Sequence, residues 1–388
     1  MSSLDALVNQ AKALADGQGV PTPEAEVARV LTICNACRYC EGFCAVFPAM
    51  TRRLAFSPAD VHQLANLCHN CGACLHACQY APPHEFAVNV PRAMAQVRGR
   101  TYAHYAWPAP LGRLYQRQGL MLSLALAAAL ALFLMLAASL HGGQSVAPGG
   151  SFYSVFPHGL LVNLFAPVFG FAVLALGLGL RNFWCDVTPV TSGQPPSAAA
   201  LAEARRDVLT LTYLGGGHGQ GCHNDDDAWT LARRHCHHLT FYGFMLCLAA
   251  TATATVAHYA LGLPAPYPLW SVPKLLGVAG GLSLMLGTAG LGWLNLRRHP
   301  LHGDPAQKPM DLGFIALLFV VAASGMGLWL AAGSTWLTGW LCLHLGSVMA
   351  LFATLPYNKF AHGIYRSAAL LRHAIEKRQP NPVGLGAD

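Results

Sequence analysis

Two cysteine runs of the same spacing constrain this chain more than any other feature of its sequence. Both follow the pattern C-x2-C-x2-C-x3-C, and they lie at residues 34–44 and 68–78. In such a run three thiolates hold one [4Fe–4S] cluster and the fourth reaches a second cluster. The crossed pattern predicts two ligand sets, Cys34, Cys37, Cys40 and Cys78 for one cluster and Cys68, Cys71, Cys74 and Cys44 for the other.

Zinc is the alternative for these cysteines. Structural zinc usually takes two C-x2-C pairs that lie well apart, whereas here four cysteines fall within eleven residues and the pattern then repeats. The spacing therefore favours iron–sulfur clusters. The proline that usually follows the fourth cysteine is absent, because Ala45 and Gln79 stand there. The exit turns are shifted, so the crossed ligation is less firmly specified than the clusters.

The rest of the chain is too apolar for a soluble protein. Hydrophobic residues make up 54% of the sequence and charged residues 11%, where about a quarter is usual in soluble domains. A span of roughly 20 apolar residues crosses a hydrocarbon core of about 30 Å. Six segments come near that length: 120–140, 157–180, 238–262, 270–294, 311–332 and 338–360. We expect a mainly α protein, with an N-terminal two-cluster ferredoxin-like domain followed by a six-helix transmembrane bundle.

The basic residues predict how the bundle is oriented. Segments 141–156, 263–269 and 333–337 contain no lysine or arginine, and the other connections carry them. By the positive-inside rule both termini and the cluster domain lie in the cytoplasm, at a bacterial inner membrane. Met1 to Val30 show no signal peptide, and cluster ligands must stay reduced before they bind iron. The net charge of +7 therefore orients the protein and does not indicate nucleic acid binding.

The chain divides by composition into seven parts. They are an amphipathic segment at 1–30 with a helix at 4–15, the cluster domain at 31–100, a linker at 101–119, helices 1–2 at 120–180, a cytoplasmic loop at 181–237, helices 3–6 at 238–362 and a tail at 363–388. In the loop, strand-like residues 208–214 precede a glycine-rich stretch, but no complete βαβ unit follows. We expect this loop to dock on the cluster domain or on a partner.

Histidines near the helix ends are the second chemical signal. His237 and His238 lie at the inner end of the third span and His258 near its outer end. His344 and His362 are 18 residues apart, five turns and roughly 27 Å on one helix face. Matching depths would pair His258 with His344, and His237 or His238 with His362. Such pairs are typical axial ligands of haem b, one or two in number, although interfacial histidines can simply bind water.

Two histidines at the outer surface and five cysteines are not assigned to a site by these patterns. His141 and His158 are spare haem ligands or contacts for a quinone. The cysteines outside the two runs have no ligand spacing, and we interpret them as small packing residues: Cys185, Cys222, Cys236, Cys247 and Cys342.

Three segments resemble the tricarballylate utilisation protein B family, also called the citrate utilisation B type. They are Thr32 to Cys40, Cys78 to Phe86 and Leu355 to Arg366, where Asn358 is a departure. The last segment is also similar to the cytochrome b subunit of respiratory nitrate reductases, in which the corresponding histidines ligate haem. The family resemblance implies a soluble FAD-dependent dehydrogenase as partner, which oxidises tricarballylate to cis-aconitate, and the membrane quinone pool as electron acceptor.

These observations give one main functional hypothesis and two alternatives. The main hypothesis passes electrons from a partner's reduced flavin through the clusters and haem b to a quinone. One alternative reverses this flow, from quinol to a soluble reductase, and the other is a membrane redox sensor. The chain shows no paired carboxylates, nucleophile with a base or flavin motif, so we expect no chemistry on a carbon substrate here.

Overall fold

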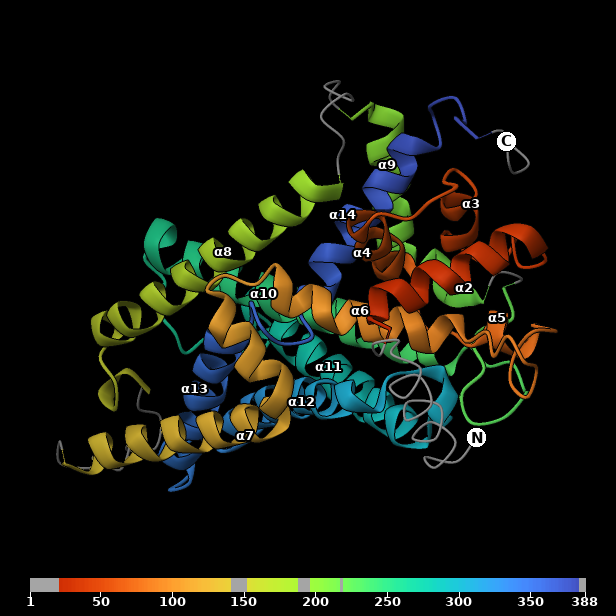
Figure 1. Cartoon of the computed structure of the whole chain (residues 1–388). Helices are drawn as coiled ribbons and strands as arrows, with labels where there is room; N and C mark the ends of the chain where they lie inside the picture. Colours follow the sequence, from red (N-terminus) through yellow and green to blue (C-terminus); the bar gives the residue numbers. More distant parts are fainter. Residues whose placement is uncertain (1–20, 141–151, 188–195, 217–218, 384–388) are drawn as a thin grey trace.

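The computed structural model describes residues 21–140, 152–187, 196–216 and 219–383. Within these ranges the chain is helical and contains no β-strand, so the predicted α class is confirmed. Figure 1 shows the N-terminal helices, in red and orange, at one end of a bundle of long helices. The helix predicted at 4–15 lies outside the described residues.

The described part of the N-terminal domain consists of five short helices, three of which have a side-chain cap at the first turn. They are α2 (Pro23–Cys37), α3 (Val46–Met50), α4 (Pro58–Leu67), α5 (Ala73–His76) and α6 (Val90–His104). Thr22 caps α2, Asn89 caps α6, and Ser57 and Asp60 form a capping box on α4. Such caps satisfy backbone N–H groups that a short helix leaves without partners.

The apolar core of this domain packs against cysteines of both runs. Leu31 of α2, Leu64 and Leu67 of α4 and Met94 of α6 are fully buried. The helix predicted at 58–67 is observed as α4. Its two leucines pack in one hydrophobic cluster with several of the cysteines, so the cysteine loops and the apolar core support each other.

Six helices of the described ranges are long and apolar enough to cross a membrane, as predicted. Five of them are α7 (Ala109–Leu140), α8 (His158–Val187), α10 (Ala232–Leu261), α11 (Val272–Arg297) and α13 (Leu337–Thr354). The sixth, α12 (Lys308–Leu330), is preceded by a turn at 305–307 that continues its span. Much of the 101–119 linker is helical as well, because α7 begins at Ala109. This helix is kinked at Gln118.

Small residues set the closest helix contacts in the bundle. A Cβ added at Gly287 of α11 would meet the backbone nitrogen of Thr240 at 2.5 Å, and one at Gly243 of α10 would meet that of Leu284 at 2.6 Å. Glycine is required at these positions, because membrane helices gain their association from close backbone packing rather than from water exclusion.

The last predicted span is wrong at its C-terminal end. Helix α13 ends at Thr354, and a separate helix, α14 (Ala361–Glu376), begins after a turn. Pro356 lies in that turn, and proline lacks the N–H that a continuing helix needs. His344 and His362 therefore do not share one face of one helix, and α14 is an amphipathic helix that includes the first part of the predicted tail at 363–388.

The long loop after α8 also differs from its prediction. Residues 208–210 end helix α9 (Ala198–Thr210), and Thr212–Gly215 form a short 3-10 helix, η3, so the strand-like interpretation is wrong. Helix α9 lies beside α14 (Figure 1), where Glu203 pairs with Lys377 and Arg378 at 3.0 and 2.8 Å.

The N-terminal domain contacts one end of the bundle through side-chain to backbone hydrogen bonds. Asn70 donates to the carbonyl of His302 at 2.8 Å and Asn89 to that of Leu301 at 3.0 Å. Tyr357, after α13, donates to the carbonyl of Trp107 at 3.0 Å. The N-termini of α10 and α12 and the C-termini of α11 and α13 thus face the cysteine-rich domain.

Candidate functional site

The first cysteine site brings together cysteines from both runs. Its cavity of about 290 Å³ is lined by cysteines at positions 34, 37, 40, 74 and 78. Helix α2 ends here because Arg38 adopts a left-handed conformation with φ 58°, which turns the chain from Cys37 toward Cys40. Cys78, the fourth cysteine of the second run, lines the same cavity as three cysteines of the first run. The crossed pattern predicts this placement.

The electrostatics of the first site describe a crowded set of thiols. Burial, followed by the neighbouring Cys40, Cys78 and Cys37, raises the pKa of Cys34 to about 12. Burial and then Cys78 raise the pKa of Cys40 to about 12 as well. Four thiols that oppose each other's ionisation in this way require a bound cation to become thiolates together.

The second cysteine site lies deeper and also combines the two runs. Cys44 of the first run lines a cavity with Cys68, Cys71 and Cys74 of the second. Burial raises the pKa of Cys44, and Cys71 and Cys68 add to the effect. Cys74 lines both cavities, so the two sites are immediate neighbours.

The donors and the space fit iron–sulfur clusters at the first site. All eight thiols are free, and soft thiolates suit iron and sulfide. A water needs roughly 10–15 Å³, so the first cavity can hold a group of many atoms. The second cavity is only about 20 Å³, so a cluster enters there if the four side chains move apart. The two ligand sets themselves stay predictions.

The inner histidines lie together as their depths predict. His237 of α10 and His362 of α14 have ring centroids 6.0 Å apart, with planes at 76°. His237 Nδ1 is buried without a hydrogen-bond partner, and His362 Nδ1 contacts the carbonyl of Lys359. Burial, together with Arg366, lowers the pKa of His362 well below its usual value, so its imidazole is neutral. His238 packs against Tyr242 instead.

The predicted outer pair is wrong. His258 stacks on His158 of α8, with ring centroids 4.2 Å apart and planes at 16°. His344 lies on α13 with its Nδ1 3.2 Å from both Ser324 Oγ and the carbonyl of Val321 on α12. The depths of these histidines match, but depth alone does not specify which helices are neighbours. His141 lies outside the described residues.

The inner pair fits a haem, whereas the outer histidines do not form a comparable pair. Two imidazoles from different helices, one with a buried nitrogen that lacks a partner, are the donors that haem iron takes. His158 and His258 stack with their ring centroids only 4.2 Å apart, against 6.0 Å for the inner pair, so they leave less space for a group between the rings. Among the described residues, His237 and His362 are therefore the histidine pair that best fits a haem.

Two family models together match most of the chain. A family model described as Citrate utilization protein B Fer4-like domain matches residues 27–104, and a second, described as Citrate utilization protein B, matches residues 111–383. The chain belongs to the citrate utilization protein B family. It is 56% identical over 389 residues to Citrate utilization protein B of Escherichia coli, with 100% of both chains covered. No solved structure matches it.

The family assignment confirms the resemblance drawn from the three sequence segments. A Fer4-like domain joined to six candidate membrane helices in the described residues indicates a multi-pass membrane protein with an iron–sulfur domain. Its role is electron transfer in citrate or tricarballylate utilisation.

Arginines that the sequence analysis did not assign to a site surround the second cysteine site. Arg98 and Arg366 each donate to the carbonyl of Cys68 at 2.6 Å, and Arg233 donates to the carbonyl of Asn70 at 2.6 Å. Burial lowers the pKa of Arg366 to about 10, with Arg98 adding to the effect. Three guanidinium groups converge here from α6, α10 and α14.

A ninth cysteine also reaches the second site. Cys222, interpreted from sequence as a packing residue, is 1% exposed and hydrogen-bonds with Cys71. That bond, together with Arg233 and Arg298, lowers the pKa of Cys222. The next residue, His223, donates its backbone N–H to the carbonyl of Cys71 at 2.9 Å. The long loop thus docks on the cluster domain, and no spacing in the sequence signals which residue makes the contact.

Proposed function

We propose that this protein carries electrons from the reduced flavin of a soluble FAD-dependent dehydrogenase, of the tricarballylate dehydrogenase type, to the membrane quinone pool. When bound, two [4Fe–4S] clusters and one haem b supply one-electron sites. Cys34, Cys37, Cys40 and Cys78 would hold the first cluster, Cys44, Cys68, Cys71 and Cys74 the second, and His237 and His362 the haem iron.

The observation that carries the proposal is how two helices connect the second cysteine site to the histidine pair. On α10, Arg233 contacts the loop of Cys71 and His237 follows four residues later. On α14, His362 comes first and Arg366, four residues later, contacts Cys68. Four residues of helix rise about 6 Å, so the two sites lie roughly one turn apart on both helices.

This arrangement favours the first cysteine site as the point at which electrons enter the protein. It opens toward the surface beside Tyr39, which is 70% exposed, whereas Cys44 and Cys68 at the second site are more deeply enclosed. Electrons from a docked flavoprotein would then pass from the exposed site to the enclosed one and on toward the bundle.

The orientation supports a cytoplasmic donor. The basic residues Arg233, Arg297, Arg298 and Lys359 cluster at the bundle end that faces the cysteine-rich domain. The connection 263–269 at the opposite end has none. The positive-inside rule then puts the cysteine sites and both termini in the cytoplasm of a bacterium, with the bundle in its inner membrane.

The chain has no part in carbon chemistry under this proposal. Its buried carboxylates are used in ion pairs, such as Glu376 with Arg53 at 2.6 Å and Asp311 with Lys359 at 2.7 Å. The oxidation of the substrate therefore belongs to the partner, and this protein reoxidises the partner's flavin.

Reconstitution tests the proposal. The protein in nanodiscs is mixed with a reduced tricarballylate dehydrogenase and a soluble ubiquinone analogue, and quinone reduction is followed optically. The wild type should reduce the quinone, and Cys34→Ser and Cys68→Ser should each abolish the rate. Cys185→Ser, which removes an exposed thiol on α8, should keep it. A wild type that does not reduce quinone, or a Cys68→Ser variant with the full rate, would contradict the proposal.

A further inference from the structure

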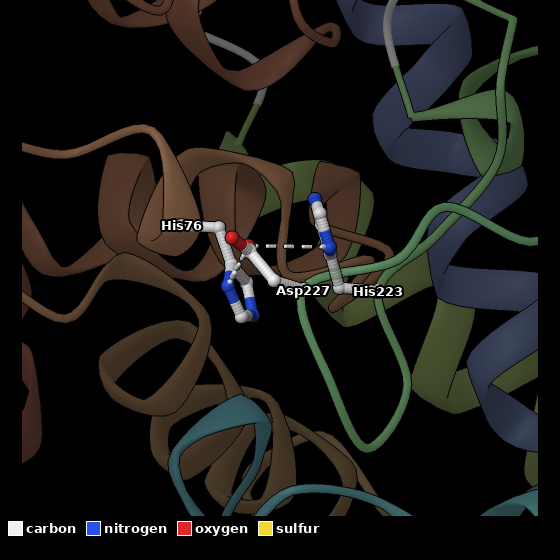
Figure 2. Close-up of side chains that lie close together, drawn as sticks. All are labelled: His76, His223 and Asp227. Atoms are coloured by element: carbon white, nitrogen blue, oxygen red, sulfur yellow. Dashed lines mark ion pairs between the residues drawn. The ribbon is translucent and has the colours of Figure 1, made fainter.

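A cluster of imidazoles and one carboxylate lies beside the cysteine sites. His76 is the last residue of α5, and His223 and Asp227 come from the loop between η3 and α10. Their ligand atoms all lie within 4.8 Å of one another. His76 Nδ1 is 2.7 Å and His223 Nδ1 3.9 Å from the same oxygen, Asp227 Oδ1. Figure 2 shows the Asp227 carboxylate beside both rings, which stack with their centroids 4.1 Å apart.

A fourth residue holds His76 in the orientation that a ligand needs. His302 is fully buried, and its Nε2 lies 2.7 Å from His76 Nε2. When His76 Nε2–H donates this bond, the lone pair of His76 Nδ1 faces Asp227. Histidines that bind metals usually donate their other ring N–H to a fixed acceptor in this way.

His223 supplies the independent observation that a ligand is missing. Its residue is 4% exposed, and neither ring nitrogen has a hydrogen-bond partner among the described residues. A buried imidazole is rarely left with both nitrogens unsatisfied. The side chain of Asp227, by contrast, is 85% exposed, so an ion can enter from solvent and keep a water ligand.

We propose that His76, His223 and Asp227 form a binding site for Zn²⁺, separate from the two cysteine sites. Two imidazoles and one carboxylate with an open position are a common ligand set for this ion. Bound there, Zn²⁺ would tie the 222–227 loop to α5 beside Cys71, whose carbonyl already accepts the His223 backbone N–H at 2.9 Å.

Zinc binding by the intact protein tests the site. Protein with its iron–sulfur clusters loaded is dialysed anaerobically against Zn²⁺, and bound zinc is counted by mass spectrometry of the metal. About one Zn²⁺ per chain should bind, and X-ray absorption should show only nitrogen and oxygen ligands at about 2.0–2.1 Å. No bound zinc, or a sulfur shell at about 2.3 Å that indicates zinc in the cysteine sites, would overturn the proposal.

Two neighbouring carboxylates provide a matched pair of variants. Asp227→Asn removes the ligand at an exposed position and should weaken Zn²⁺ binding by at least about 10-fold. Asp226→Asn keeps an oxygen for the Ala228 N–H that Asp226 Oδ1 accepts at 3.0 Å, and it should bind Zn²⁺ as the wild type does. Equal binding by both variants, whether retained or lost, would show that Asp227 is not a ligand.

Discussion

The three arginines at the second cysteine site point at backbone carbonyls and not at carboxylates. Arg98, Arg233 and Arg366 each donate to a carbonyl of residues 68–70, so their positive charge is not cancelled by a paired acid at that point. Reduction adds negative charge to a cluster, and nearby cations stabilise the reduced form. The arginines therefore favour electron transfer from the first site to the second.

Removing one of these charges should lower the potential of one cluster only. Arg366→Gln keeps a donor for the Cys68 carbonyl and deletes the charge, which should lower the midpoint potential of the second cluster by roughly 100 mV, from Coulomb's law for a unit charge about 7 Å away at an effective dielectric constant near 20. A redox titration followed by EPR measures the shift. Arg100→Gln, which changes an arginine paired with Glu24, is the control. An unshifted potential in Arg366→Gln would contradict this role.

The inner histidines can be tested separately from the cysteines. His362→Ala should remove the haem absorption band and leave the cluster EPR signals, because His362 faces His237 and lies outside both cysteine cavities. His235→Ala is the matched control, since His235 is exposed on α10 two residues before His237. A haem band that survives His362→Ala would exclude this ligand pair.

At the scale of elements, α14 attaches the C-terminal region to the cysteine-rich domain. Glu376 pairs with Arg53 at 2.6 Å and with Arg372 at 3.1 Å, and all three side chains are largely buried. Arg53 also pairs with Asp60 in the first turn of α4. This network fixes the helix that carries His362 and Arg366 against the domain that carries the cysteines.

Breaking that network should destabilise the cysteine-rich domain. Glu376→Gln leaves the buried Arg372 guanidinium without a carboxylate and Arg53 with Asp60 alone, and breaking a buried pair typically costs about 3–5 kcal/mol in the free energy of unfolding. Glu203→Gln breaks pairs with Lys377 and Arg378, which are far more exposed, and should cost about 0–1 kcal/mol. Denaturant unfolding in detergent, followed by circular dichroism, compares the two. Equal losses would show that α14 is not held by Glu376.

Most of the elements could be predicted from the sequence, and the exceptions have local causes. Uninterrupted apolar runs identify the six spans, since a membrane helix must satisfy its own backbone. The apolar run continues to Leu355, and the break that follows it is signalled by Pro356 and by the polar Asn358 and Lys359. The residues at 208–214 alternate like a strand, yet Ser197 caps a helix that continues to Thr210.

The candidate site was less accessible to prediction. Cysteine spacing predicts that both runs contribute to each site, and both cavities are lined by cysteines of the two runs, while the two ligand sets remain predictions. The pairing of His258 with His158 depends on which helices are neighbours, and no local pattern encodes that. Arg98, Arg366 and Cys222 reach the second site from distant segments for the same reason.

At the scale of the whole molecule, the cysteine-rich domain, α9 and α14 lie at one end of the bundle (Figure 1). Membrane orientation therefore decides which compartment holds the electron donor. A green fluorescent protein fused to the C-terminus should fluoresce in bacterial cells, and an alkaline phosphatase fusion at the same point should be inactive. The opposite result would place the cysteine sites outside the cytoplasm and contradict a soluble cytoplasmic partner.

The central claim is that two neighbouring thiolate sites hold iron–sulfur clusters that carry electrons toward the membrane bundle. The most direct measurement is low-temperature EPR of the detergent-purified protein after reduction with dithionite, together with its iron and sulfide content. We predict signals of two [4Fe–4S] clusters that interact magnetically, because Cys74 borders both cavities. A protein that contains zinc in these cysteines, with no sulfide and no EPR signal, would contradict the claim.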